Sequence, residues 1–183
     1  MNERLFQLAI HQDKFNSCQI MAPNYTPHNW WECDVWGVTR AGYAVEYEIK
    51  LSLADFRADK KKVVNWSYTK KKLARGTFKH DLLADGSPFG PTRFFYCVPE
   101  EIEYLIRPEL PEWAGLIIAR PARRTLWIRE VVKAKRLHST KVTNAALLLC
   151  GQRLANRYWP VLHDMNRIVQ TEREREGIPN AAN

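Results

Sequence analysis

The 183-residue sequence has no long apolar run, and it starts without a recognisable targeting segment. Its longest strongly apolar stretch, Ala145 to Cys150, is far shorter than the ~20 residues that a bilayer-spanning helix needs. The first residues, Met1 to Arg4, lack the basic start and apolar core of a signal peptide. We therefore expect a cytoplasmic protein with no membrane partner.

Cysteine and histidine are few and widely spaced. The four cysteines, Cys18, Cys33, Cys97 and Cys150, form no C-x-x-C pair, and the five histidines show no zinc-ligand spacing. A cytosolic chain of this length buries enough apolar surface to fold without covalent staples. The sequence therefore predicts neither a disulfide framework nor a structural zinc site.

Acidic residues are missing where the basic residues gather, and the net charge is +8. Residues 60–80 carry eight Lys or Arg and no acid, and residues 120–141 carry eight more against Glu130 alone. Aromatic rings such as Trp66 and Phe78 lie within the first block, and cations beside stacking rings suit a nucleic-acid surface. The alternative is a solvated basic helix face. The candidate nucleic-acid-binding residues are Lys60, Lys61, Lys62, Lys70, Lys71, Lys72 and Arg75.

The pattern of apolar residues predicts one mixed α/β domain. We expect a first helix over residues 2–15, a short strand at 17–21, a loop at 22–29, and a hairpin of strands 31–39 and 43–51 with Gly42 left-handed. Ser52-x-x-Asp55 is a capping box for a helix reaching about residue 66. Further strands are expected at 93–98, 114–119 and 126–132, a short helix at 100–106, and helices at 144–158 and 161–176 separated by Pro160.

One face of the second hairpin strand carries three charged residues, Glu46, Glu48 and Lys50. A solvent-facing strand would explain them. With a loop of residues 40–42, however, Thr39 pairs with Tyr43 and Asp34 falls opposite Glu48. Facing like charges destabilise a sheet, whereas a divalent cation between the two carboxylates would convert the repulsion into ligation.

This arrangement resembles the PD-(D/E)XK nuclease superfamily, which has the restriction-endonuclease-like fold. The matching residues are Asp34 and Glu48-Ile49-Lys50, followed by Lys-x-Ser, an Asp-Phe-x-x-Asp-Lys helix, and the aromatic strand that ends in Val98-Pro99. These later features are similar to the small bacterial DNA-repair (MmcB-like) branch. Cys33 stands where the motif name has Pro. The resemblance covers about residues 1–132 and implies an αβββαβ core with a mixed central sheet, extra strands and C-terminal helices.

The resemblance also implies a site. Asp34, Glu48 and the Ile49 backbone carbonyl would hold Mg²⁺ or Mn²⁺, Lys50 would assist catalysis, and Glu3 in the first helix is a further candidate ligand. Glu3 could instead interact with the helix dipole. Glu46 and Asp59 are candidates for supporting the metal ligands or the substrate, with a solvated strand residue and an ordinary helix surface as the alternatives.

We expect a single nuclease-like domain over residues 1–176, with a core of about 1–132, a helical extension at 143–176, and a flexible tail at 177–183. The first hypothesis is an Mg²⁺-dependent nuclease that acts on DNA in repair, recombination or phage biology; the residues do not separate DNA from RNA. The second is a non-catalytic nucleic-acid-binding accessory protein on the same fold. The third is a dimeric structural or assembly protein whose C-terminal helices pair with those of a second copy, and an exposed apolar face over residues 144–158 would support it.

Overall fold

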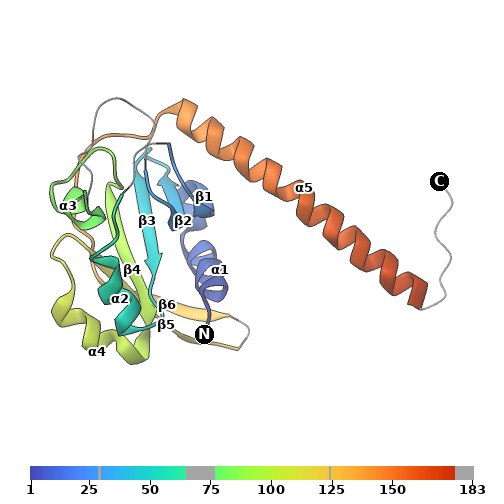
Figure 1. The fold of residues 1–183 in the computed structure, drawn as a ribbon, viewed down its shortest axis with the longest axis horizontal. Helices are drawn as coiled ribbons and strands as arrows, with labels where there is room; N and C mark the ends of the chain where they lie inside the picture. The colour runs from blue at the N-terminus through green and yellow to red at the C-terminus, as the bar shows by residue number, and fades with distance from the viewer. Residues whose placement is uncertain (29, 65–76, 124, 176–183) are drawn as a thin grey trace.

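The computed structural model describes residues 1–28, 30–64, 77–123 and 125–175, and its centre is a six-stranded sheet (Figure 1). The strands are β1 (Cys18–Tyr25), β2 (Cys33–Thr39), β3 (Ala44–Ile49), β4 (Arg93–Pro99), β5 (Gly115–Pro121) and β6 (Leu126–Val132). The α-helices are α1 (Glu3–Lys14), α2 (Leu53–Asp59), α3 (Lys79–Ala84), α4 (Glu103–Ile106) and α5 (Asn144–Arg175). Short 3-10 turns lie at Phe15–Ser17, Glu100–Ile102 and Arg107–Glu109.

The strands lie in the sheet in sequence order, and the sheet is mixed. β1, β2 and β3 pair antiparallel, β3 to β4 and β4 to β5 pair parallel, and β5 to β6 is again antiparallel. The α1–β1–β2–β3–α2–β4 order contains the αβββαβ succession expected from the sequence, with α3 added before β4. The expected mixed α/β class is confirmed.

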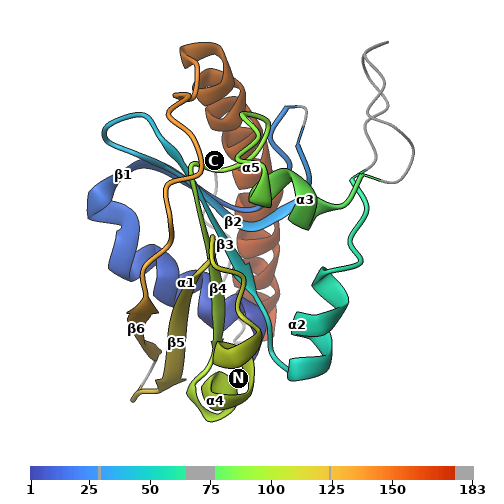
Figure 2. The same cartoon turned by 90° about the vertical axis from the view of Figure 1, so that its left-hand side faces the viewer.

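Helices cover both faces of the sheet (Figure 2). Phe6 and Ile10 of α1 pack with Tyr47 on one face, in one apolar cluster. Phe56 of α2 and Leu83 of α3 belong to the cluster on the other face. Side chains alternate along a strand. Val45, Tyr47 and Ile49 of β3 therefore face α1, whereas the even-numbered residues Glu46 and Glu48 face α2 and α3.

The hairpin register expected from the sequence is confirmed. Thr39 N donates to Tyr43 O at 2.9 Å, and the ladder runs from Val38↔Ala44 to Val35↔Tyr47. Gly42 has φ +87°, a left-handed conformation that favours glycine at this loop position. One residue beyond this ladder, Asp34 Oδ2 accepts from the Ile49 N–H at 2.7 Å, so its carboxylate lies next to the peptide that joins Glu48 to Ile49.

Three expected boundaries were wrong. β1 continues through Tyr25, where the prolines and asparagines of the sequence predicted a loop. An edge strand tolerates Pro23 because one side of its backbone pairs with no other strand, so the missing N–H breaks no ladder there. α2 ends at Asp59 rather than near residue 66, and Val63 instead forms a β-bridge with Phe78. The expected break at Pro160 is also absent, since α5 is one helix of 32 residues that includes it.

α5 leaves the sheet near β1 and projects away from the rest of the molecule (Figure 1). All four cysteines are buried and free of disulfides. Within residues 1–175, apart from the undescribed positions, no helix is long and apolar enough to cross a membrane.

Candidate active site

The charged face of β3 is buried rather than solvent-facing. Glu46 is 0% exposed, Glu48 is 1% exposed, and Lys50, directly after the strand, is 7% exposed. α2 and α3 cover this face of the sheet, and both helices add charged groups to it (Figure 2). A solvated strand face is therefore the wrong explanation for these residues.

Lys79, the first residue of α3, is the fully buried counter-ion of the two glutamates. Its Nζ lies 2.9 Å from Glu46 Oε1 and 2.8 Å from Glu48 Oε2. The ammonium also lies 4.7 Å from the ring centroid of Phe94, within the range of a cation–π interaction. Both oxygens of Glu46 further accept from Trp31 Nε1, at 2.8 and 2.9 Å.

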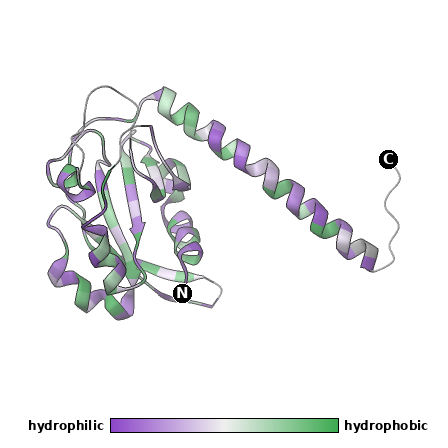
Figure 3. Cartoon of the chain, in the orientation of Figure 1, coloured by the Kyte–Doolittle hydropathy of each residue, from purple (hydrophilic) through white to green (hydrophobic). Residues whose placement is uncertain are grey.

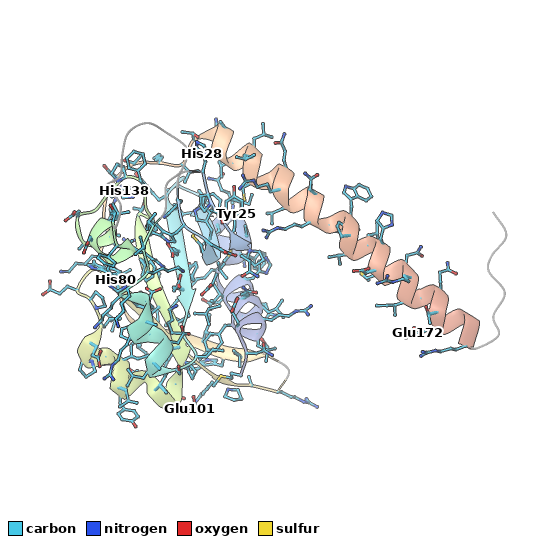
Figure 4. All side chains as sticks on the ribbon, in the orientation of Figure 1. Tyr25, His28, His80, Glu101, His138 and Glu172 are labelled. Atoms are coloured by element: carbon cyan, nitrogen blue, oxygen red, sulfur yellow. The ribbon has the colours of Figure 1, made fainter. Side chains whose placement is uncertain are left out.

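Lys50 joins this pair to Asp59 at the end of α2. Its Nζ donates to Glu48 Oε1 at 2.9 Å and lies 3.4 Å from Asp59 Oδ1. The other oxygen of Asp59 accepts from the Tyr96 hydroxyl at 2.8 Å and lies 3.0 Å from His80 Nε2. His80 lies at the edge of this network, on the α3 side of the sheet (Figure 4).

The cluster is nearly balanced in charge. Lys50, Lys79 and the half-buried Lys62 form ion pairs with carboxylates, and Lys62 Nζ lies 3.3 Å from Glu48 Oε1. Burial by itself would raise the pKa of Glu48, but the charges of the lysines, chiefly Lys79, hold it below its usual value. Burial raises the pKa of Glu46 to about 7, although Lys79 opposes this.

The Asp59 carboxylate is also held in its charged form. Burial would raise the pKa of Asp59, but the hydrogen bond to His80 and the charge of Lys79 hold it well below its usual range. Conversely, the pKa values of Lys50 and Lys79 are raised despite burial, because each ammonium faces several carboxylates. The cluster therefore holds these two lysines in their charged form.

Asp34 is the carboxylate without a matching cation. Its Oδ2 accepts from the Ile49 N–H at 2.7 Å, and no Lys or Arg among the described residues forms an ion pair with it. Burial and then the charge of Glu48 raise the pKa of Asp34 to about 6, against the effect of the Ile49 N–H. Thus the acid that the hairpin register brings beside Glu48 carries uncompensated negative charge.

The other expected ligands lie at the same end of the strands. Glu3 is the first residue of α1, and its Oε1 accepts from Gln7 Nε2, which also donates to the Asp34 carbonyl at 3.2 Å. Ile49 ends β3, beside the Asp34 carboxylate. The described ranges contain no cluster of three or more His, Cys, Asp or Glu arranged for a metal.

Those of the expected nucleic-acid-binding residues that the structure describes divide into two groups. Lys60 and Lys61 are exposed after α2, with Lys60 Nζ 3.5 Å from a Glu109 oxygen. Lys62 contacts Glu48, so its ammonium belongs to the buried cluster. The remaining members of the expected set, Lys70, Lys71, Lys72 and Arg75, lie outside the described residues.

Sequence reasoning missed four members of the cluster. In the sequence, Lys79 is one of the eight basic residues of the block 60–80, and Trp31 is the first residue of the expected hairpin strand 31–39. His80 and Tyr96 carried no assigned role at the site. The aromatic strand was noticed, but the parallel register that sets Tyr96 beside Glu48 and Phe94 beside Glu46 has no short-range signal. Lys79 also had no signal, because a single lysine looks alike whether it is buried or exposed.

Comparisons with known proteins add a similarity of fold. No protein-family profile matches the chain, and no curated protein sequence matches it. The structure is similar to that of the SPO1766 protein of unknown function from Silicibacter pomeroyi, with a TM-score of 0.50 and 22% sequence identity. The match covers 94% of this chain and 91% of that one. At this level of identity the likeness concerns the fold alone.

Proposed function

We propose that the protein is a metal-dependent phosphodiesterase of the PD-(D/E)XK type that cleaves DNA. The observation that carries this proposal is the pair of carboxylates, Asp34 and Glu48, on adjacent strands with the Lys50 ammonium 2.9 Å from Glu48. The basic surface of a protein with net charge +8 would hold the polyanionic substrate.

The residues fit Mg²⁺ or Mn²⁺ in donor type and in charge. Asp34 and Glu48 supply hard oxygen donors, with the Ile49 carbonyl as the third candidate ligand. Asp34 is the acid that the neighbouring lysines leave unpaired, and its raised pKa reflects its burial and the charge of Glu48. A divalent cation between the two groups would remove this repulsion. When bound, such an ion would lower the pKa of a coordinated water and neutralise charge on the phosphate.

The protein side chains would then orient and balance the reacting groups. Lys50 is held between Glu48 and Asp59, so its ammonium is positioned beside the site and stays protonated. Lys62, whose side chain is 39% exposed, is the lysine that can leave Glu48 most easily when a cation or phosphate arrives. Lys60 and Lys61 would contact the substrate backbone.

A second function has its own supporting observation. Both oxygens of Glu48 already accept from lysine ammonium groups, two of them on the buried residues Lys50 and Lys79. A carboxylate satisfied in this way can serve the fold alone. The alternative is therefore a non-catalytic nucleic-acid-binding accessory protein, in which the cluster is purely structural.

A cleavage assay separates the two. Purified protein would be incubated with plasmid, single-stranded and branched DNA, and with RNA, in Mg²⁺ or Mn²⁺. We expect DNA cleavage that falls at least a hundredfold in Asp34→Asn, which keeps an acceptor for the Ile49 N–H but loses the charge. Lys50→Ala should also lose cleavage. Glu112→Gln, a change at an exposed acid away from the cluster, is the matched control.

The result that would overturn the nuclease proposal is equally clear. Wild-type protein that binds DNA in a salt-dependent way, but cleaves no substrate with either metal, would establish the accessory function instead. If Asp34→Asn cleaved DNA as fast as wild type, the active site would not be the Asp34 and Glu48 pair. Thermal unfolding of each variant shows whether a loss of cleavage comes from a loss of folding.

A further inference from the structure

The apolar stripe of α5 is longer than the surface against which the helix packs. Along the helix, residues recur at alternating spacings of four and three, which is the seam pattern of a coiled coil. The seam positions are Leu147, Gly151, Leu154, Tyr158, Val161, Met165 and Ile168. Figure 3 shows apolar residues continuing along the helix far beyond the sheet.

The first half of this stripe is covered by the chain itself. Leu147 and Leu154 pack against the buried cluster on the α2–α3 face, together with the fully buried Cys150. Arg153 donates to the Thr26 carbonyl at 2.9 Å, and Arg157 donates to the carbonyls of Pro23 and Asn24 at 2.8 and 2.7 Å. These contacts hold the helix to β1 and the segment after it, as far as Arg157.

The second half has no such cover. Among the described residues, the hydrogen bonds and ion pairs of those beyond Arg157 are made within the helix itself. Met165 is 59% exposed and Ile168 is 56% exposed. Both belong to the same seam as Leu154, which packs against the core cluster in the first half of the helix. The exposed large apolar residues of this half are Tyr158, Trp159, Val161, Leu162, Met165, Ile168 and Val169. We call this set the distal stripe.

The size of the distal stripe suits an interface. Seven large apolar side chains that are each about half exposed present on the order of 600 Å². This area is at the upper end of the range for the largest apolar patch of a typical monomer, about 300–600 Å². It is about three quarters of the ~800 Å² that a stable complex buries on each partner. Most of the stability of a helix in a protein comes from packing of its apolar face, so packing against a partner would also stabilise this segment.

The chemistry of the stripe favours a second helix over a lipid surface or nucleic acid. The polar residues of the segment 158–172 include Arg167 against Asp164 and Glu172, so the segment is not basic. A helix that lies on anionic lipid or DNA carries Lys and Arg on its polar face instead. The coiled-coil spacing calls for a helix with the same spacing, and the same helix in another copy of the chain supplies it.

We propose that the protein is a homodimer in which the distal stripe of α5 packs against the distal stripe of a second copy. An exposed apolar face over residues 144–158 was the expected sign of such a dimer, but in the structure most of that segment's apolar stripe packs on its own domain. The interface therefore begins at Tyr158. A hollow of about 340 Å³ between α1 and β1, lined in part by Leu8, Met21 and Pro23, adjoins the point where α5 departs. It offers further apolar surface to the partner helix.

Sedimentation of the full-length chain tests this proposal. We expect wild-type protein to sediment at about twice its 21.4 kDa monomer mass. Met165→Glu and Ile168→Glu, each made separately, should raise the dimer dissociation constant at least tenfold, because each would place a charge in the apolar seam. Arg167→Glu places an acid on the side of the helix opposite the distal stripe and should remain a dimer.

Three results would overturn the proposal. These are a wild-type chain that is monomeric up to high micromolar concentration, a dimer that both seam variants leave intact, and a monomer that binds vesicles of anionic phospholipid through the same residues. Circular dichroism of each variant at low concentration controls for folding. Because all the substituted side chains are exposed in the monomer, the helix content should be unchanged.

Discussion

Globular proteins usually bury apolar residues and expose charged ones, and two regions of this protein depart from that rule. The covered face of β3 buries charged residues, and the distal half of α5 exposes apolar ones. On the β3 face, Glu46, Glu48 and Lys79 are almost completely buried, although such residues are rarely inside. On the distal half of α5, residues such as Met165 and Ile168 are exposed, although such residues are usually inside. One region holds charges away from water, and the other presents apolar surface to it.

The difference teaches what each region requires. Buried charges need partners at bonding distance, and the lysines provide them, so the cluster is complete except at Asp34. Exposed apolar surface needs a cover, and the described chain provides one only as far as Arg157. Departures of this kind occur where a protein binds something. A cation and a second copy are the proposed partners.

The largest expected effect comes from removing the central lysine. Lys79→Met keeps the apolar stem but leaves Glu46 and Glu48 without their shared counter-ion. We expect a loss of about 3–5 kcal/mol in the free energy of unfolding, measured by urea denaturation. Lys135→Met, at an exposed lysine paired with Glu112, should leave the stability unchanged. Equal stability of the two variants would mean that the cluster is not a buried ion network in solution.

Asp59 provides a pH test of the same region. Because the folded-state pKa of Asp59 is lowered, its ionised form stabilises the fold above the unfolded pKa of about 3.9. This contribution is lost as the pH falls below about 4. We expect Asp59→Asn to lower the free energy of unfolding by about 2–3 kcal/mol at neutral pH and to flatten its decline in acid.

The neighbouring acids should act in the opposite direction. Glu46 and Asp34 have raised pKa values, about 7 and about 6, so their protonation favours the folded state as the pH falls from 8 to 5. This part of the profile should remain in Asp59→Asn. Asp81→Asn, at an exposed acid of α3, is the matched control and should retain the wild-type decline in acid. A decline that is identical in wild type and Asp59→Asn would contradict the assignment.

The two halves of α5 can be compared with matched truncations. Leu154→Ala should cost about 1–3 kcal/mol, because this side chain packs against the core cluster. Met165→Ala should leave the stability of dilute protein unchanged and reduce it only at concentrations where the dimer forms. Chemical denaturation at two protein concentrations measures both. A concentration-independent loss at Met165 would place that residue against its own chain.

The smallest expected effect concerns the attachment of α5. Arg157→Ala removes two hydrogen bonds to backbone carbonyls before the helix projects. We expect a loss of at most about 1 kcal/mol in global stability, with faster amide hydrogen exchange confined to α5. Arg167→Ala, whose partner Asp164 lies on the same helix, serves as the control. Similar exchange in both variants would mean that Arg157 does not hold the helix.

Local signals predicted much of the fold. The Arg40-Ala41-Gly42 loop determined the hairpin register, and Ser52 caps α2 by accepting from Asp55 N at 3.1 Å. Failures occurred where tertiary context outweighs local preference. Pro23 and Asn24 predicted a loop, yet β1 continues through them: Pro23 and Tyr25 pair with β2, and Asn24 between them has a left-handed φ of +46°. Pro160 predicted a break, yet α5 continues through it.

The candidate site was predictable in part. Asp34, Glu48 and Lys50 could be chosen because they lie within one hairpin, where register follows from loop length. Lys79, His80 and Tyr96 could not, because they join Glu48 and Asp59 only through the parallel pairing of β3 with β4 and the packing of α3. The choice of Glu46 and Asp59 as supporting residues fits the network they form, although their proposed role toward a metal or substrate is a separate prediction.

The sequence by itself determined the alternation of β3, the register of its hairpin and the seam spacing of α5, because each depends on residues close together in the chain. Only the tertiary structure decided that the charged side of β3 is buried and that Lys79 lies between its two glutamates. It also decided that the apolar stripe of α5 extends beyond the surface on which the helix packs. Burial depends on which distant segments pack together. The alternation of charged and apolar residues along a strand is the same whether the charged face is exposed to solvent or buried. A strand pattern can therefore name a pair of carboxylates, but only packing shows which of them lacks a cation.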